Sequence, residues 1–235
     1  MKYLRKYETE ADIDIDVTPN VVLVNDTKKV LYNVPPQQPL GVFIQHVDGK
    51  LYTTDEWTAK GFSNDEANGV AVSTEECAFV IAKEDAIGDK MWTSNRGTLI
   101  EGIITTKDSN VAKNDYRGKE NTDLILVTDT SEAVYSCANF LFPNGAKGYC
   151  PALGEFDIVA QNYTEIKRML EIIGGRGLKE NTYTWSSTPS DAWNAWAFSV
   201  NRLAPQELGK SYYCRARPFT TLSPSDIPSE EPKVL

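Results

Sequence analysis

The sequence has 235 residues and a formal net charge of −9. Hydrophobic residues make up 41% of it and charged residues 24%, which is ordinary for a soluble globular protein. No apolar run approaches the roughly 18 residues that a membrane span needs, and the N-terminus turns acidic where a signal peptide would be apolar. We therefore expect no membrane insertion and no signal-directed export. The acidic balance also argues against nucleic acid, because phosphate binding needs clustered Lys and Arg.

Residues 1–39 are predicted to form a β-rich N-terminal segment. The runs at 21–24 and 30–34 are separated by turn-forming residues and predict a hairpin. Residues 11–17 alternate apolar side chains with three aspartates, a pattern typical of an edge strand with one wet face. Those carboxylates are also calcium ligands in principle, but on an extended strand they would not converge, and we expect no metal. A proline cluster at 35–39 then predicts a linker.

The next stretch is predicted to begin a second, larger domain with two kinds of strand. Asp48-Gly49 lies between two apolar runs and predicts a hairpin, because this dipeptide supplies the positive φ angles of a type I′ turn. The apolar runs at 70–72 and 78–82 predict strands, and the unbroken second run suits a buried one. Residues 83–122 are polar, and we predict a long loop there with one packed insert at 91–95.

Capping residues and helical periodicity predict four helices. Each begins after a side chain that can accept a bond from the first turn, or ends at a glycine. The predicted helices are a short one capped by Thr54 and ended by Gly61, a second capped by Asn64 and ended by Gly69, a third capped by Ser131 with Ala133, Val134, Cys137 and Ala138 on one face, and a long one from about Glu155 that carries Phe156, Val159, Ile166, Met169, Leu170 and Ile173 on one face and ends at Gly174-Gly175.

Motifs for catalysis or cofactor binding are missing from the sequence. There is no GxSxG, HExxH, Walker loop or dinucleotide fingerprint. The single histidine, His46, is interpreted as a hairpin residue, and carboxylates such as Glu155 and Asp157 show no spacing that singles out an acid/base pair. The four cysteines form no CxxC pair and are expected to be mostly buried small hydrophobes: Cys77, Cys137, Cys150 and Cys214. We expect no enzyme activity, no cofactor and no metal.

The C-terminal third is rich in tryptophan and small polar residues. At 195–200 the side chains of Trp196 and Phe198 alternate with those of Ala197 and Ser199, so the first pair is predicted to face the core and the second pair the solvent. Aromatic residues mixed with Ser, Asn and Arg are typical of protein surfaces that bind a partner, although an ordinary solvated β surface has the same composition. Residues 223–235 are rich in Pro, Ser and Glu and predict a flexible tail.

Five motifs in this order resemble a known family. They are GYCPALGE at 148–155, the helix end at 174–175, WSST at 185–188, NAW at 194–196 and RARPF at 215–219. They are similar to the C-type-lectin-like domain related to formylglycine-generating enzymes, which occurs in the variable proteins of diversity-generating retroelements and in Bacteroides and phage proteins. The resemblance implies an α+β, C-type-lectin-like fold at 40–222, with mixed, mainly antiparallel sheets, two helices and long loops.

The resemblance also implies two sets of residues in the C-terminal region. The framework set is Trp185, Ser186, Ser187, Trp196 and Arg217. The displayed, ligand-binding set is Thr184, Ser190, Trp193, Ala197, Ser199, Arg202, Gln206, Tyr212 and Tyr213. The close cysteine pair of formylglycine-generating enzymes is missing, as are the EPN, QPD and WND signatures of calcium-dependent lectins, so neither activity is implied.

The N-terminal stretches MKYLRKYETEAD at 1–12, TPNVVLV at 18–24 and VLYN at 30–33 are similar to the N-terminal segments of structural proteins from Bacteroides phages and prophages. Together the resemblances imply a non-enzymatic receptor-recognition protein of a phage or prophage particle, made in the host cytoplasm. Its expected partners are a bacterial surface protein or glycan, other virion proteins through residues 1–39, and further copies of itself in a homo-oligomer. The alternatives are a structural decoration or fibre protein that uses the domain for subunit contacts, and an exported bacterial surface binding protein or an enzyme of the formylglycine-generating family.

Overall fold

The computed structural model describes residues 21–24, 29–32, 39–95, 97–178 and 182–222. The chain divides into two compact units, Met1–Gln38 with Ser229–Leu235, and Pro39–Pro228. In the first unit, β1 (Val21–Val24) pairs antiparallel with β2 (Lys29–Tyr32), which confirms the predicted hairpin. The predicted strand at 11–17 with its aspartates, the linker at 35–38 and the tail at 223–235 lie outside the described residues.

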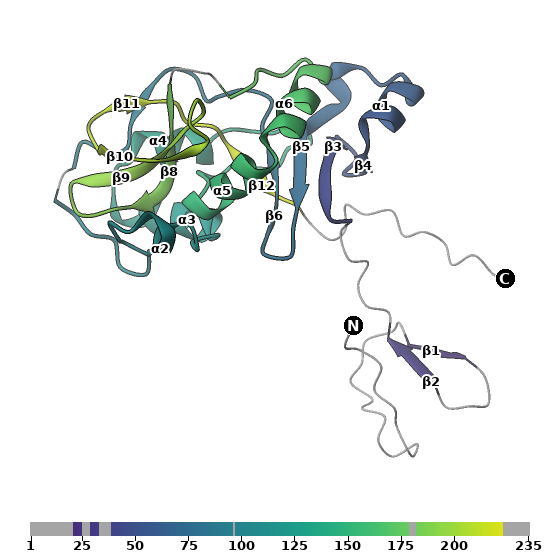
Figure 1. The fold of residues 1–235 in the computed structure, drawn as a ribbon, viewed down its shortest axis with the longest axis horizontal. Helices are drawn as coiled ribbons and strands as arrows, with labels where there is room; N and C mark the ends of the chain where they lie inside the picture. The colour runs from purple at the N-terminus through teal and green to yellow at the C-terminus, as the bar shows by residue number, and fades with distance from the viewer. Residues whose placement is uncertain (1–20, 25–28, 33–38, 96, 179–181, 223–235) are drawn as a thin grey trace. The chain divides into compact units, whose positions relative to one another are not determined.

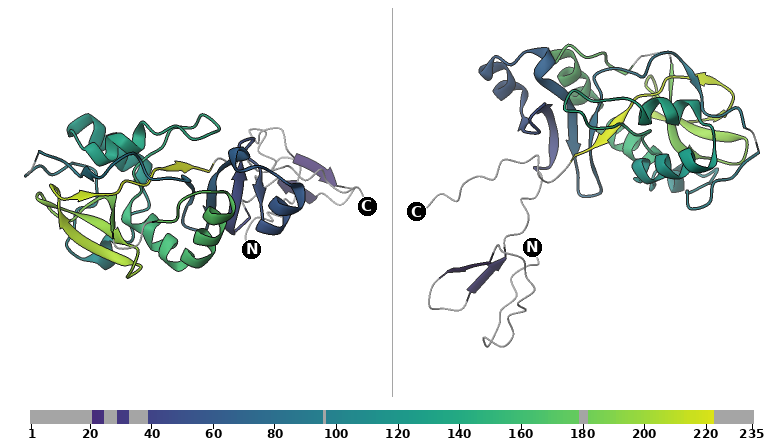
Figure 2. Two further views of the ribbon diagram at one scale, coloured as in Figure 1. Left: turned by 90° about the horizontal axis from the view of Figure 1, so that it is seen from above. Right: turned by 180° about the vertical axis from the view of Figure 1, so that it is seen from behind.

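Two antiparallel sheets organise the second unit. One has five strands in the order β12-β6-β5-β3-β4, and the other has three in the order β10-β9-β8. The strands of the first are β3 (Gly41–His46), β4 (Leu51–Tyr52), β5 (Ala67–Ser73), β6 (Ala78–Ile81) and β12 (Phe219–Thr221), and those of the second are β8 (Tyr183–Pro189), β9 (Asn194–Ser199) and β10 (Ala204–Gly209). A short ladder joins β7 (Lys90–Met91) to β11 (Tyr213–Cys214). The larger sheet lies at one end of this unit and the smaller at the other, as Figures 1 and 2 show.

Six α-helices lie in the described residues, where the sequence predicted four and the family resemblance implied two. They are α1 (Thr54–Lys60), α2 (Ser109–Ala112), α3 (Gly118–Thr128), α4 (Glu132–Ala138), α5 (Leu153–Gln161) and α6 (Tyr163–Ile172), with one 3-10 turn, η2 (Asn64–Glu66). Helix α6 packs on β3 and β5, and α5 packs on β8, β9 and β10. Helix α3 also contacts β8, and α4 contacts β7. The fold is therefore mixed α+β with antiparallel sheets, as expected.

The first hairpin of this unit is confirmed, but its turn type is not. Gly49 has a φ of 92°, whereas Asp48 is not among the residues with positive φ. Gly49 N–H donates to the His46 carbonyl at 2.9 Å, and His46 N–H donates to Lys50 at 2.9 Å. This is a three-residue loop that ends in a left-handed glycine, the next most common hairpin after the two-residue turns.

The predicted helix before Gly69 is replaced by one 3-10 turn and then by β5. A Cβ atom on Gly69 would lie 2.3 Å from the Ile81 carbonyl oxygen, so glycine is required there by the close approach of β5 to β6. The helix predicted at 55–60 is confirmed as α1, with its cap one residue earlier than expected. The Thr53 hydroxyl accepts from the Glu56 N–H at 3.3 Å, and the Glu56 carboxylate accepts from the Thr53 N–H at 2.8 Å.

The long helix predicted from about Glu155 is two helices joined at Asn162. The Asn162 side chain donates to the Ile158 carbonyl at 2.9 Å and so closes the last turn of α5. All six side chains predicted for the inner face are buried, and Gly174, with a φ of 68°, ends the second helix as expected. Ser131 caps α4 as predicted, since its hydroxyl accepts from the Val134 N–H at 3.3 Å.

The stretch at 83–122 is more regular than predicted. It contains β7, α2 and the start of α3. Its expected packed insert is confirmed, because Trp92 is fully buried and donates through Nε1 to the Ser186 carbonyl at 2.8 Å. The cysteines are free thiols, three of them buried and Cys77 half-buried, as expected of small hydrophobes.

Candidate binding surface

A buried polar network holds β8 in place. The Thr188 hydroxyl donates to the Asp115 carboxylate at 3.0 Å, and Asn121 donates to the same carboxylate at 2.7 Å. The Ser186 hydroxyl donates to the Trp196 carbonyl at 2.7 Å. These partners satisfy the small polar side chains of the WSST motif inside the protein.

The five residues expected to form the framework are all buried. Arg217 illustrates why its position requires this residue type. Its guanidinium donates to Asp85 at 2.7 Å and to the carbonyls of Ala82 and Arg176 at 2.8 and 3.0 Å. Burial lowers the pKa of Arg217, and the Asp85 carboxylate opposes that effect. The guanidinium therefore joins three separate segments of the chain.

Four residues of the expected ligand-binding set are buried, which corrects their predicted exposure. They are Thr184, Ser190, Ala197 and Ser199. The alternation at 195–200 was interpreted as one buried and one exposed face, but β9 is the central strand of its sheet, and helices approach this sheet from more than one side. Ala197 packs with Trp92 and Trp185, whereas Phe198 packs with Phe156 of α5. Both faces of the strand are therefore core.

The exposed Arg202 and the half-buried Gln206 lie apart from the three remaining members of the set. Arg202 is in the turn that joins β9 to β10, and its guanidinium donates to the Gln206 amide oxygen at 3.4 Å. Six residues of strand separate Arg202 from the open end of this hairpin, roughly 17 Å at the rise of an extended chain, and Gln206, in the middle of β10, is three residues from that end, roughly 10 Å. The nine predicted residues therefore do not form one surface.

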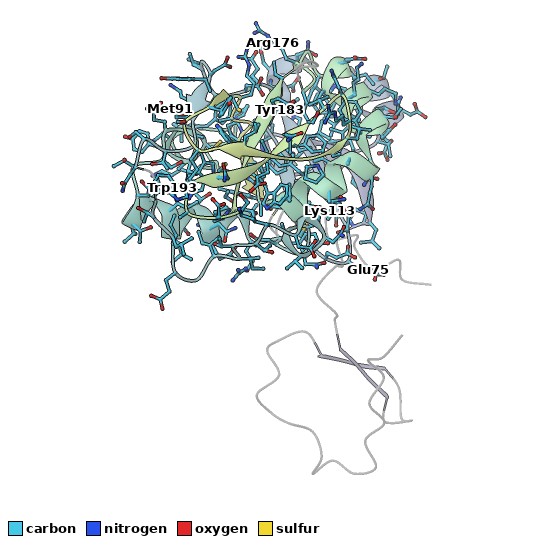
Figure 3. All side chains as sticks on the ribbon, turned by 60° about the vertical axis from the view of Figure 1, so that its left-hand side comes forward. Glu75, Met91, Lys113, Arg176, Tyr183 and Trp193 are labelled. Carbon is cyan, nitrogen blue, oxygen red and sulfur yellow. The ribbon has the colours of Figure 1, made fainter. Side chains whose placement is uncertain are left out.

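Three exposed aromatic side chains remain, and they flank the open end of the β9–β10 hairpin. Trp193 precedes β9, Tyr212 follows β10, and Tyr213 begins β11; they are 59%, 62% and 65% exposed. We call these three residues the aromatic end. Figure 3 shows Trp193 at the periphery, on the same side as Met91, the residue paired with Tyr213.

The turn that carries Trp193 is braced by Asp191. One Asp191 carboxylate oxygen accepts from the N–H groups of Trp193 and Asn194, each at 2.7 Å, and the other lies 2.9 Å from the Lys107 ammonium. Burial disfavours the charged carboxylate, but Lys107 and the donated hydrogen bonds outweigh it and hold the pKa of Asp191 well below its usual range. The brace stays ionised at any pH near neutrality.

Each of two exposed rings lies against a glycine. A Cβ on Gly97 would be 3.5 Å from two atoms of the Trp193 indole, and a Cβ on Gly209 would be 3.3 Å from the Tyr212 ring. The Gly97 N–H donates to the Ala192 carbonyl at 3.1 Å, so the segment that follows β7 is tied to the Trp193 turn. A side chain at Gly97 or Gly209 would therefore meet the Trp193 or the Tyr212 ring.

Sequence reasoning found the three aromatic residues and missed their supports. The spacing Asp191-x-Trp193-Asn194 is a detectable signal, because an aspartate often bonds the N–H two residues later in a turn. Lys210 offered no such signal, since lysine is rarely buried. Its side chain is nevertheless only 1% exposed, and its ammonium lies 4.5 Å from the centre of the Trp92 ring.

Side chains that bind metal ions do not gather in the described residues. The described part of the chain holds no group of three or more His, Cys, Asp or Glu side chains arranged to bind a metal ion. His46 lies in β3 against the rings of Phe62 and Tyr52, at 4.7 and 6.2 Å between centroids. Among the described residues, none of the helices has the length and apolar character to cross a membrane.

The fold and this surface define a mixed α+β protein with an exposed aromatic cluster. Comparison with known proteins finds no family model and no curated protein that matches the chain. Among solved structures, the fold is similar to that of a fimbrial protein from Bacteroides ovatus ATCC 8483, with a TM-score of 0.55 and 13% sequence identity over 77% of this chain. The match covers 48% of that protein, so this chain spans about half its length. At this identity the likeness concerns the fold alone.

Proposed function

We propose that this chain is a non-enzymatic binding protein displayed on a surface, and that the aromatic end contacts its partner. The observation that carries the proposal is the exposure of three large aromatic side chains on braced turns. A rigid Trp or Tyr contributes contact area at low entropic cost, and such residues dominate binding energy at interfaces. Bracing of the Trp193 turn by Asp191 reduces the ordering that is needed on binding.

In its finer form the proposal concerns the partner and the particle. The partner is a protein or glycan on a bacterial surface, and the chain is carried by a phage or prophage particle through its N-terminal segment. Support comes from the sequence resemblance at 148–219 and from the structural neighbour, which is named a fimbrial protein. A surface role for that neighbour's fold is compatible with display of the aromatic end.

A second candidate function is a structural subunit of a fibre or other particle. It is favoured by helix α3, which exposes Leu124, Leu126 and Val127, three apolar side chains within four residues. An exposed apolar group of this kind is typical of contacts between proteins. In this alternative α3 is buried between subunits and the aromatic end has no partner on the cell.

Cell binding by matched variants tests the proposal. The full chain, labelled with a fluorophore, is added to intact Bacteroides cells that bind it, and binding is compared with that of W193A/Y212A/Y213A. We expect the triple variant to lose at least tenfold in affinity while its circular dichroism and melting temperature stay near those of the parent. R202A/Q206A, in the closing turn and the middle of β10 of the same hairpin, is the control and is expected to bind within twofold of the parent.

Two outcomes would overturn the proposal. A folded triple variant that binds as the parent does would show that the aromatic end makes no contact. An equal loss for R202A/Q206A would show that the contact is not confined to this end. If instead L124S/V127S prevents particle assembly while the aromatic variant has no effect on cell binding, the structural-subunit function is favoured.

A further inference from the structure

We propose that Lys210 is the positioning residue of the aromatic end, an inference that rests on the proposed function. This buried lysine ties two turns to the segment after β7: the turn before β9, which carries Trp193, and the turn after β10, which carries Tyr212. Its role is to fix the relative positions of Trp193 and Tyr212 without touching the partner itself.

Both main-chain groups of Lys210 bond to the other two segments. Its N–H donates to the Trp193 carbonyl at 2.9 Å, and its carbonyl accepts from the Thr93 N–H at 3.1 Å. Two residues further on, the Tyr212 N–H donates to the Gly209 carbonyl at 2.9 Å and closes the turn. The backbone at Lys210 is therefore shared by the turns that present the two rings.

The side chain adds contacts that only a long cation can make. The ammonium donates to the Thr98 carbonyl at 3.2 Å and lies 4.5 Å from the centre of the Trp92 ring. Trp92 is itself fixed, because its indole N–H donates to the Ser186 carbonyl and its main-chain carbonyl accepts from the Ser131 hydroxyl. Lys210 thus connects the surface turns to the framework through a cation–π contact.

The charge of Lys210 is not explained by an ion pair. Within the described ranges it forms no salt bridge; Asp129 and Asp191 attract it only at longer range, and burial lowers its pKa. A buried ammonium is costly unless it is well compensated, so an apolar side chain of the same length would serve the core at least as well. The cation therefore serves to order the two turns of the aromatic end and not to stabilise the protein as a whole.

The test compares variants that separate length from charge. K210M keeps the four-atom stem and removes the ammonium, and K210R keeps a cation that can stack on Trp92 and bond to Thr98. K147M removes an exposed lysine elsewhere in the chain and is the control. Amide hydrogen exchange of the full chain is measured at residues 190–194 and 209–213 and, as an internal reference, in β5 and β6. Cell binding is measured in parallel.

We expect K210M to speed exchange in the two turns at least tenfold, to leave β5 and β6 unchanged, and to weaken cell binding at least tenfold. K210R is expected to recover most of both losses, and K147M to behave as the parent. The inference is overturned if K210M exchanges and binds as the parent does, or if it speeds exchange equally everywhere, which would indicate general destabilisation.

Unchanged binding by K210M beside a loss in the aromatic triple variant would reject the role of Lys210 and leave the proposed function standing. Unchanged binding by the triple variant would reject the proposed function, and the exchange result would still decide whether Lys210 braces the turns.

Discussion

The buried carboxyl of Glu155 makes the stability of the protein depend on pH, and this dependence can be measured. This carboxyl on α5 is buried, and its two oxygens accept from the Tyr149 hydroxyl at 2.6 Å and from the Ala152 N–H at 2.7 Å. The described residues contribute no ion pair to it. Burial raises the pKa of Glu155 to about 8; the two hydrogen bonds oppose this, and the negative charges of Asp115 and Glu120 add to it.

A raised pKa means that the folded state binds this proton more tightly than the unfolded state does. Stability contributed by Glu155 is therefore complete below the unfolded value near 4.5 and is lost as pH rises toward the folded value of about 8. At about 1.4 kcal/mol per pH unit, the loss across this window is about 5 kcal/mol. Above the folded value the contribution no longer changes with pH.

Replacement of Glu155 by Gln removes the ionisable carboxyl group and keeps a side chain of the same size and shape. The free energy of unfolding is measured by urea titration at pH 5, 6.5 and 8 for the parent, E155Q and E132Q, the last of which changes an exposed carboxylate on α4. Between pH 5 and 8 we expect the free energy of unfolding of the parent to fall by several kcal/mol relative to that of E155Q. The free energies of the parent and E132Q are expected to change with pH in the same way. Parallel curves for the parent and E155Q would refute the reasoning.

Three further predictions follow from single positions. G69A is expected to destabilise the protein by about 3 kcal/mol or more in urea titrations, because its Cβ would meet the Ile81 carbonyl; a loss below about 1 kcal/mol would mean that β5 and β6 can separate at little cost. L203G is expected to raise the unfolding free energy by about 1 kcal/mol, since Leu203 has a φ of 46°; a lower stability would show that its side-chain contacts outweigh the strain. D191A is expected to lower stability by about 1 to 2 kcal/mol and to weaken cell binding more than fivefold, because Trp193 loses its brace; unchanged binding would contradict that role.

Features set by local sequence were predictable. The cap at Ser131, the left-handed glycines that end α1 and α6, and the existence of strands β5 and β6 depend on residues close in the chain or on unbroken apolar runs. The three exposed aromatic residues were also identified from the sequence, through the family resemblance and the mixture of aromatic and small polar residues in the C-terminal third.

Features set by distant contacts were not predictable in the same way. Helix α3 was missed because its buried face is polar and its exposed face is partly apolar. Asn121 and Thr122 are buried near Asp115, whereas Leu124 and Val127 are exposed. The alternation in β9 predicted which side chains share a face, but not that helices distant in the sequence cover both faces. The same limit applies to Lys210, whose burial depends on Trp92 and Thr98, more than 100 residues earlier.

The central claim is that the aromatic end contacts a partner on the bacterial surface, and site-directed photo-crosslinking on cells tests it most directly. A photoreactive phenylalanine is placed at Tyr212 in one protein and at Arg202, on the closed end of the same hairpin, in another. The account predicts covalent adducts with cell-surface material from position 212 and none above background from position 202. Adducts from position 202 alone, or equal yields from both positions, would contradict it.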